Sequence, residues 1–403
     1  MPIEERKHFK THIYFIVTLF LSTLPIHSTE SRNVTTDTRR SLLVLPAAAQ
    51  TPESAIGRIL TSPTSKTKTL QSTKVVLGQT LFFDKRLSSD GTLSCAVCHD
   101  PAMAFAGKEP IAVGIERGTR NAPSLFNVAF ASSYFWDGRV HTLEEQAKQP
   151  LLNQAEMGMM SEALLVQRIS SIKYYQHLFR KVFREPDISL DMVASAIAEY
   201  ERTLVSADSP FDRFIAGNAN AMTNAQKRGW ELFKSKARCI QCHLYTRRAP
   251  FFTDFNFHNT GVGIEAKSFE AVMKSALSLV ENDQTFDIGG LAHQPQFSEL
   301  GRFLVTRKLQ DMAAFKTPTM RNIELTGPYM HDGSLPTLLD VVRFYNRGGV
   351  SNRMLDQKVK PLELSEKEMN DLVDFLRALT SDDVLRLVQS SRSQTRERVV
   401  LPN

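Results

Sequence analysis

The chain has 403 residues but only four cysteines and two tryptophans. All four cysteines lie in two Cys-x-x-Cys-His motifs, so none is left to form a disulfide, and export cannot be argued from disulfide bonds. An apolar run at residues 13–24 falls short of the ~20 residues that a comfortable bilayer span needs. Hydrophobic residues still make up 42% of the chain, which is enough for ordinary packed cores.

The two cysteine motifs, residues 95–99 and 239–243, have the spacing that is typical of c-type haem attachment. In that chemistry two thiols bond the vinyl groups of one porphyrin, and the histidine that follows becomes a ligand of the iron. A zinc site usually needs four protein ligands in one cluster, and a thioredoxin-like redox pair does not need the histidine. The sequence therefore predicts two covalently bound haem c groups. Their attachment residues are Cys95, Cys98, Cys239 and Cys242, and their proximal iron ligands are His99 and His243.

The amino terminus has the pattern of a secretory signal, because basic residues precede the apolar run at 13–24. No clear cleavage site follows the run, so residues 1–27 are either a signal peptide or an uncleaved membrane anchor. Since c-type haem is attached outside the cytoplasm, we expect a periplasmic protein, free or anchored to the inner membrane. The net charge of +6 leaves out the haem propionates, about two per haem, which would cancel much of it, so no nucleic-acid partner is inferred.

Helical patterns surround each haem motif. Residues 28–73 show little periodicity and are expected to form a flexible linker. Apolar residues over 75–82 then predict a helix before the first motif, and a capping box at Thr223 predicts a helix before the second. Amphipathic helices are expected to close the two units at 193–204 and 365–379.

A helix, a haem motif and a closing helix are the layout of a cytochrome c domain, and this layout occurs twice. We therefore predict an all-α fold with two cytochrome c-like haem domains in tandem. The amino-terminal domain is expected at 74–215 and the carboxy-terminal domain, with a basic tail, at 216–403.

An internal repeat supports a duplicated domain, because three short matches share one separation of 195 residues. The matching segments are 123–127 with 318–322, 136–138 with 331–333, and 142–143 with 337–338. The two haem motifs are separated by only 144 residues, so about 51 extra residues lie in the second copy. We place them in the segment 244–314.

Together these residues resemble the bacterial di-haem cytochrome c peroxidase and methylamine-utilisation (MauG-type) family, over residues 75–380. The resemblance is carried by the two haem motifs and by the segments 81–84, 135–139, 143–147, 155–158, 257–263 and 328–333. It implies that the amino-terminal haem is the peroxide-reactive site. It also implies that the carboxy-terminal haem transfers electrons, holding or relaying the second oxidising equivalent.

The resemblance gives roles to three further residues. Trp136 matches a tryptophan that lies between the two haems and assists electron transfer. Glu156 matches an acid above the peroxide-reactive haem, where a carboxylate can carry a proton from one oxygen of the peroxide to the other. Gln146 matches a glutamine that can hold peroxide or water by hydrogen bonds. Outside these motifs, the same residue types are usually a core aromatic, a solvated acid and a polar helix residue.

A calcium ion is implied as well, because the family commonly holds one between its domains through an asparagine side chain and backbone carbonyls. The matching residues are Asn121, Thr326 and Pro328. Oxygen ligands suit this hard cation.

The chain departs from the common peroxidase pattern at two places. Many members carry a histidine in the loop after the first motif that blocks the iron until the other haem is reduced. Residues 100–120 contain no histidine, and Ile115 stands near its place, so we expect an open peroxide site. The peroxidases have a methionine as the second ligand of the carboxy-terminal haem, where this chain has Tyr345; the matching residue in the first repeat is Pro150, which cannot bind iron.

MauG-type enzymes have this combination, and an oxygen ligand favours higher oxidation states of iron more than a thioether does. Met330 and Met354 are alternative iron ligands, although packing is the more common role for methionine. His331 is expected to hold a haem propionate or a hydrogen bond rather than iron, because its repeat partner is Trp136.

Three functions are compatible with this sequence. The first is an exported peroxidase that reduces hydrogen peroxide to water with electrons from a small cytochrome c or cupredoxin. The second, favoured by Ile115 and Tyr345, is a MauG-type enzyme that uses peroxide to oxidise tryptophan or tyrosine residues of a partner protein. The third is a non-catalytic di-haem electron carrier, which would need neither Glu156 nor Gln146. A homodimer is a further open alternative.

Overall fold

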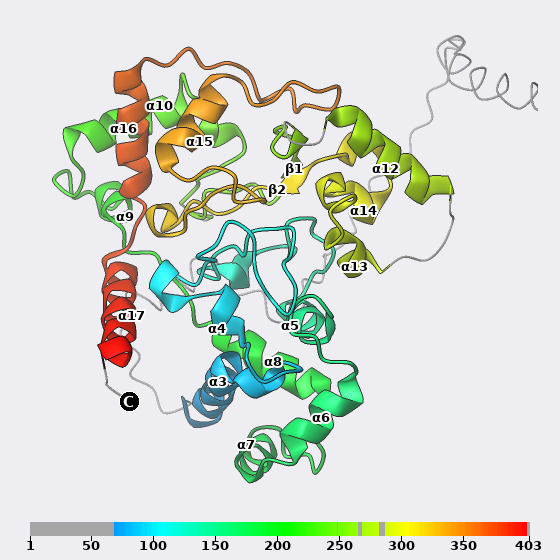
Figure 1. Ribbon diagram of the computed structural model, residues 1–403. Helices are drawn as coiled ribbons and strands as arrows, with labels where there is room; N and C mark the ends of the chain where they lie inside the picture. Colours follow the sequence, from blue (N-terminus) through cyan, green and yellow to red (C-terminus); the bar gives the residue numbers. More distant parts are fainter. Residues whose placement is uncertain (1–67, 248, 265–267, 282–286, 401–403) are drawn as a thin grey trace, which may run out of the picture. The chain divides into compact units, whose positions relative to one another are not determined.

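The computed structural model describes residues 68–247, 249–264, 268–281 and 287–400 (Figure 1). The predicted signal peptide or anchor, residues 1–27, lies outside the described residues, as does the predicted linker up to residue 67. The first described helix begins at Lys68, within the range that the composition assigns to the linker. Within the described ranges, no helix is long and apolar enough to cross a membrane.

The described part of the chain is mostly helical, as predicted, with one two-stranded sheet. The α-helices are α3 (Lys68–Phe83), α4 (Cys95–Cys98), α5 (Leu143–Leu152), α6 (Glu162–Ser170), α7 (Lys173–Phe183), α8 (Leu190–Glu201), α9 (Pro210–Ile215), α10 (Asn224–Lys234), α12 (Phe269–Glu281), α13 (Ile288–Ala292), α14 (Phe303–Thr306), α15 (Leu338–Asn346), α16 (Glu366–Arg377) and α17 (Asp382–Val400). Short 3₁₀ helices span Lys85–Leu87, Pro101–Met103, Val128–Phe130, Cys239–Gln241, Ser298–Leu300, Leu309–Asp311 and Ile323–Leu325. The strands β1 (Phe257–His258) and β2 (Phe315–Lys316) pair antiparallel, with Phe257 opposite Lys316.

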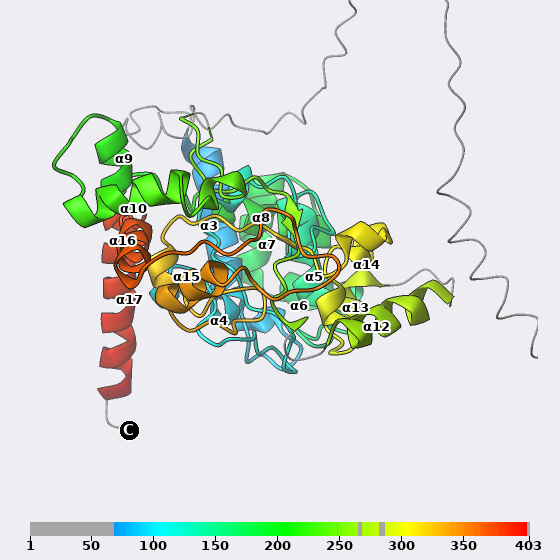
Figure 2. The same ribbon diagram turned by 90° about the horizontal axis from the view of Figure 1, so that it is seen from above.

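Two matching helix crossings form the framework of the fold. The helix before each haem motif packs on the closing helix of its own unit, α3 on α8 and α10 on α16; α10 and α16 lie side by side in both Figure 1 and Figure 2. A Cβ at Gly78 would lie 1.9 Å from the carbonyl oxygen of Ala196, and a Cβ at Gly229 would lie 1.9 Å from that of Asp371. Only glycine allows this approach of two backbones. Each of these glycines begins the same short pattern, Gly-x-x-Leu-Phe, at residues 78–82 and 229–233, so the sequence repeats together with the helix crossing.

Separate hydrophobic clusters follow from these crossings. The first is formed around α3 and α8 and includes Leu77, Phe82 and Ile197. The second is formed around α10 and α16 and includes Phe233 and Phe375. A further cluster belongs mainly to the inserted segment 244–314, whose helices α12, α13 and α14 are grouped in both views (Figures 1 and 2). The inserted residues therefore have a core of their own.

The internal repeat is also visible in the backbone. Asn127 and Asn322 both adopt the left-handed conformation, with φ values of 61° and 59°. The N–H of Ser206 donates to Asn127 Oδ1 at 3.0 Å, and the N–H of Ser381 donates to Asn322 Oδ1 at 3.0 Å. The hydroxyls of Ser206 and Ser381 lie 2.7 Å apart, so the equivalent corners of the two repeats meet.

The last helix departs from this symmetry. Val384 and Val388 of α17 pack in the first hydrophobic cluster, and the Arg392 guanidinium donates to the carbonyl of Ala102 at 3.1 Å. These residues belong to the predicted basic tail of the second domain, and yet Val384 and Val388 are part of the first hydrophobic cluster.

Candidate active site

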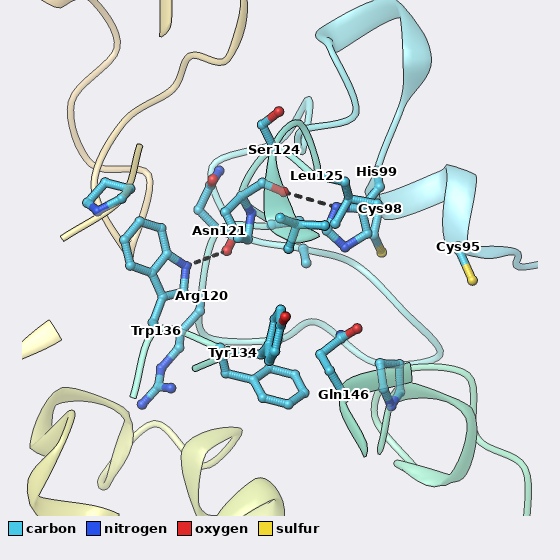
Figure 3. A pocket seen from close by; sticks show the side chains of 18 of the residues that line it. Cys95, Cys98, His99, Arg120, Asn121, Ser124, Leu125, Tyr134, Trp136 and Gln146 are labelled. Carbon is cyan, nitrogen blue, oxygen red and sulfur yellow. Dashed lines mark hydrogen bonds between the residues drawn. The ribbon is translucent and has the colours of Figure 1, made fainter. Parts of the chain in front are cut away.

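A cavity of about 310 Å³ opens beside the first Cys-x-x-Cys-His motif (Figure 3). Cys95, Cys98 and His99 form part of its wall, and residues from the second repeat, among them Lys316 and Tyr329, form another part. Burial raises the pKa of the Cys98 thiol to about 11, with a contribution from the nearby carboxylate of Glu156. A redox-active thiol pair would show a lowered pKa instead, so this pair fits thioether attachment better than disulfide exchange.

The histidines predicted to be proximal iron ligands are held in the same way in both motifs. His99 Nδ1 lies 3.0 Å from the carbonyl oxygen of Pro123 and 3.2 Å from that of Phe105. His243 Nδ1 lies 2.9 Å from the carbonyl oxygen of Phe252. Because Nδ1 must donate to these carbonyls, Nε2 is left as the ligand atom.

The protonation states of His99 and His243 also favour iron binding. Burial lowers the pKa of His99, and it lowers the pKa of His243 to about 4. Both imidazoles are therefore neutral near pH 7, which is the form that binds a metal. The thiols and the imidazole on the cavity wall fit a haem c, and the repeated histidine geometry fits a second one.

The polar residues predicted above the first haem line the same cavity. Gln146 lies in the first turns of α5, which begins at a capping box between Thr142 and Glu145. Pro150 lies one turn further along α5 and also lines the cavity. It is the residue that matches Tyr345 in the repeat, and a proline side chain cannot bind iron, which is consistent with the predicted open site. Glu156 lines the cavity from the turn after α5.

The loop after the first motif fixes the backbone at Glu156. The N–H of Ile115 donates to the carbonyl of Glu156 at 2.8 Å, and the N–H of Glu116 donates to that of Ala155 at 3.0 Å. A Cβ at Gly114 would lie 2.4 Å from the carbonyl oxygen of Ala155, so glycine is needed for this contact. Ile115 thus stands directly beside Glu156 and offers no iron ligand.

One residue of this site has no signal in the sequence. His293, from the inserted segment, lines the cavity, and its Nε2 lies 3.1 Å from Glu156 Oε1. It belongs to no repeat and no motif, so sequence reasoning had no reason to select it.

Trp136 lies where the two repeats meet. Its indole N–H donates to the carbonyl of Asn121 at 2.8 Å (Figure 3), and the N–H of Asn121 donates to the carbonyl of His331 at 2.7 Å. The carbonyl of Trp136 accepts from the N–H of Lys316 in β2 at 2.8 Å. His331 stacks on Phe315 with ring centroids 3.6 Å apart, and its Nε2 lies 2.9 Å from Glu299 Oε2. As expected, His331 holds a hydrogen bond.

The residues predicted to bind calcium share the first cavity. Asn121, Thr326 and Pro328 all line it. The Asn121 amide nitrogen donates to the carbonyls of Glu109 and Pro110, each at 3.2 Å, which leaves its side-chain oxygen available to a cation. Calcium remains a prediction.

Tyr345 is a half-buried residue of α15. Burial raises the pKa of its phenol, and the thiols of Cys242 and Cys239 raise it further, so the ring lies near the second motif. Of the two alternative ligands, Met354 packs in the cluster of the inserted segment and Met330 lines the first cavity. These positions favour Tyr345, which remains a predicted ligand.

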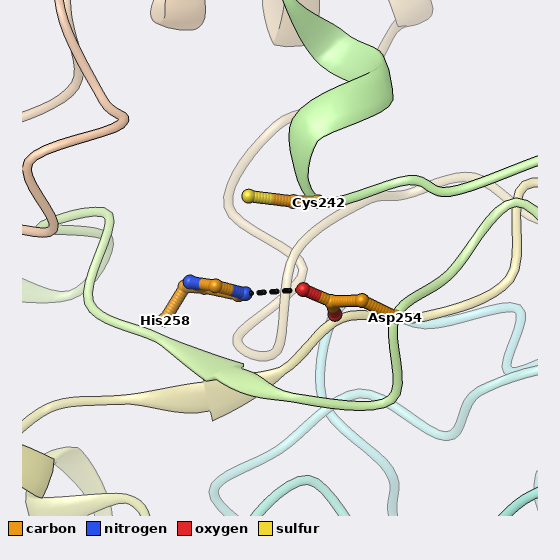
Figure 4. Close-up of side chains that lie close together, drawn as sticks. All are labelled: Cys242, Asp254 and His258. Carbon is orange, nitrogen blue, oxygen red and sulfur yellow. Dashed lines mark hydrogen bonds and ion pairs between the residues drawn. The ribbon is translucent and has the colours of Figure 1, made fainter.

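An ionic cluster lies beside the second motif (Figure 4). His258 Nε2 lies 2.9 Å from Asp254 Oδ2, and His258 Nδ1 lies 2.5 Å from Asp356 Oδ2. Burial alone would lower the pKa of His258, but its contacts with Asp254, Cys242 and Asp356 raise it to about 10. Cys242 also lies within metal-binding reach of Asp254 and His258, but a thioether at Cys242 removes its thiolate. The cluster, called the His258 clamp below, is therefore an ion-paired group beside the second haem motif, in which His258 links Asp254 to Asp356.

Comparison with known proteins identifies the family of this chain. The family model described as di-haem cytochrome c peroxidase matches residues 72–220. The methylamine utilization protein MauG of Methylorubrum extorquens is 36% identical over 347 residues, covering 85% of this chain and 86% of that protein. The cytochrome-c peroxidase IdrP2 of Denitromonas iodatirespirans is 35% identical over 346 residues, covering 85% and 91%.

Solved structures include a MauG-like protein associated with microbial copper homeostasis, with a TM-score of 0.64 and 29% identity over 85% of this chain and 96% of that one. The di-haem peroxidase BthA of Burkholderia thailandensis has a TM-score of 0.61 and 25% identity over 78% of this chain and 87% of that one. The chain therefore belongs to the di-haem cytochrome c peroxidase and MauG family, and this membership implies two c-type haems.

Proposed function

We propose that this chain is an exported di-haem peroxidase that reduces hydrogen peroxide to water with electrons from a small cytochrome c or cupredoxin. One observation carries the proposal: Glu156 and Gln146 line the same cavity as Cys98 and His99. An electron carrier has no need of a cavity with a carboxylate and an amide at its haem. Family membership supports peroxidase chemistry in general.

The roles of the residues follow from their chemistry. A haem c held by His99 would supply the redox-active iron at which peroxide reacts. The Gln146 amide can donate a hydrogen bond to peroxide, and Glu156 can take a proton from one of its oxygens and deliver it to the other. Trp136 connects the site to the second repeat through the backbone of Asn121.

We also propose that each repeat is a haem domain of its own and that the second haem, held by His243 and Tyr345, transfers electrons. The repeated backbone contacts of His99 and His243 support this assignment. The periplasm is the proposed location, because c-type haem attachment takes place there. A calcium ion at Asn121, Thr326 and Pro328 is proposed to join the two repeats.

The first prediction concerns Glu156. In the di-haem protein, Glu156→Gln should slow the reaction with peroxide by about a hundredfold or more, because a positioned proton-transfer group contributes at least that much. The measurement is the stopped-flow rate of haem oxidation by peroxide, with Glu185→Gln, an exposed acid on the surface, as the control. A wild-type rate in Glu156→Gln would contradict the proposed role.

A second candidate is MauG-type oxidation of a partner protein, which Ile115 beside Glu156 and Tyr345 near the second motif favour. The two functions differ in the source of the electrons that reduce the protein after peroxide has oxidised it. Rapid turnover of peroxide with reduced cytochrome c supports the peroxidase. An oxidised state that persists with this donor, and that is discharged by forming oxidised tryptophan or tyrosine on another protein, supports the MauG-type enzyme.

A further inference from the structure

The inserted segment 244–314 brings a histidine to the peroxide site. Helix α13 ends at Ala292, and the N–H of His293 closes this helix by donating to the carbonyl of Gly290 at 3.2 Å. His293 then reaches the wall of the cavity that holds Glu156. About 51 residues of this segment have no counterpart in the first repeat, and the segment supplies a side chain of the second repeat to the cavity of the first.

The position of His293 is fixed by the loop that follows the first haem motif. The Thr119 hydroxyl donates to the carbonyl of Ala292 at 2.7 Å, and the Arg120 guanidinium donates to that of Ser298 at 3.1 Å. A Cβ at Gly118 would lie 3.7 Å from His293 Nδ1, so the loop packs against the imidazole itself. This is the loop that also holds the backbone of Glu156.

The contact between the two side chains leaves two buried atoms unsatisfied. His293 Nε2 lies 3.1 Å from Glu156 Oε1. Glu156 Oε2 and His293 Nδ1 are both buried, and neither has a hydrogen-bond partner among the described residues. Buried polar atoms are normally paired, so an unpaired oxygen and nitrogen in a cavity wall point to a polar occupant. A peroxide or water molecule at Oε2 would satisfy this oxygen.

The other charged and titratable neighbours of Glu156 in the described residues already have a partner or a predicted role. Arg139, whose charge acts on Glu156, is paired with Asp137 at 2.9 Å. Cys98 and His99, which also feel its charge, are the residues that fit haem attachment. The imidazole of His293 is therefore the proton-exchanging side chain that contacts Glu156 directly.

We infer that His293 is a positioning residue of the peroxide reaction: it holds Glu156 Oε1, leaves Oε2 for peroxide, and exchanges a proton with the carboxyl group. The inference rests on the proposed function. Reduction of hydrogen peroxide breaks the O–O bond and consumes two electrons from the redox donor and two protons from solvent, giving two water molecules. Glu156 carries a proton between the two peroxide oxygens, and His293 passes protons from solvent to Glu156.

The experiment uses two small probes of the di-haem protein that need no turnover. Cyanide arrives as HCN and must give up a proton when it binds the oxidised haem, whereas carbon monoxide binds the reduced haem without a proton. His293→Ala should slow cyanide binding and the peroxide reaction by about tenfold or more, and leave the rate of carbon monoxide binding unchanged. His293→Gln can still contact Glu156 but cannot exchange a proton, so it should not restore the rates. His177→Ala, an exposed histidine of α7, is the control.

Each of the following outcomes would overturn the inference. Wild-type cyanide binding in His293→Ala excludes any proton role. If His293→Ala slows the binding of cyanide and of carbon monoxide equally, or if His293→Gln has wild-type rates, His293 has only a structural role. Conversion of a low-spin haem signal to a high-spin one in His293→Ala makes it an iron ligand. If Glu156→Gln is slow but His293→Ala is not, this inference fails while the proposed function stands. If neither variant slows the peroxide reaction, the proposed function fails as well.

Discussion

At the scale of single residues, the predicted ligand Tyr345 would decide the oxidation chemistry available to the second haem. Burial raises the pKa of its phenol, so the ring becomes an anionic ligand only if the positive charge of a bound iron offsets that burial. Tyr345→Phe should therefore change the electron paramagnetic resonance signal of one haem and raise its reduction potential, because an anionic oxygen stabilises oxidised iron.

Tyr245→Phe is the matched control, since Tyr245 packs against the second hydrophobic cluster. The measurement is the spectrum of the all-ferric protein together with a potentiometric titration of both haems. Identical spectra for Tyr345→Phe and the wild-type protein would rule out Tyr345 as a ligand.

The sequence identifies residues whose chemistry requires a fixed spacing, and it misses residues brought in from a distance. Cys95, Cys98 and His99 are found because a macrocycle fixes their separation. Glu156 and Gln146 are found only through resemblance to a family, and the structure places both in the wall of one cavity. His293 cannot be found in this way, because its partner Glu156 lies far away in sequence and no local pattern records their contact.

At the scale of elements, the His258 clamp joins β1 to the chain around Asp356 and should make stability depend on pH. In the haem-loaded protein, where Cys242 would be a thioether, Asp254 and Asp356 still raise the pKa of His258 above 6.5, so the folded protein holds this proton more tightly than the unfolded chain. The stabilisation is complete below pH 6.5 and is lost as the pH rises through the raised pKa of His258 in the folded protein. His258→Gln should therefore be less stable than the wild type at pH 6 and approach it by pH 10.

Urea unfolding of both haem-loaded proteins across this range measures the difference. Asp356→Asn should reproduce part of it, because Asp356 is one of the two carboxylates that hold the imidazole. A difference in unfolding free energy that stays constant from pH 6 to pH 10 would show that His258 acts through packing rather than through its charge.

The helices themselves are the elements that the sequence predicts best. The capping box at Thr223 and the one at Ser365 start α10 and α16 where expected. The apolar periodicity of a helix does not show which helix it packs against. The contacts of α3 with α8 and of α10 with α16 are indicated only by the repeated glycines Gly78 and Gly229. The short strands β1 and β2 have two residues each, which is too short for any alternating pattern to show.

At the scale of the whole chain, the duplication predicts two similar units, and the structure shows where they stop being independent. Residues that the repeats share give equivalent contacts, such as the backbone N–H groups that donate to Asn127 Oδ1 and Asn322 Oδ1. The segments without a counterpart cross from one unit to the other: the inserted segment reaches Glu156, and α17 packs in the first cluster. A repeat alignment cannot predict such contacts, because it describes only what the two copies have in common.

If α17 joins the two units in this way, weakening it should destabilise the first unit although it follows the second in sequence. Replacing Val384 and Val388, which are 3% and 1% exposed, with alanine removes two buried methyl groups from each. Each change should cost about 1 to 3 kcal/mol of unfolding free energy. Gln389→Ala, at the next and exposed position, should cost almost nothing. Thermal unfolding of the haem-loaded protein, followed at the first haem, measures the effect, and valine variants as stable as Gln389→Ala would show that α17 does not support the first core.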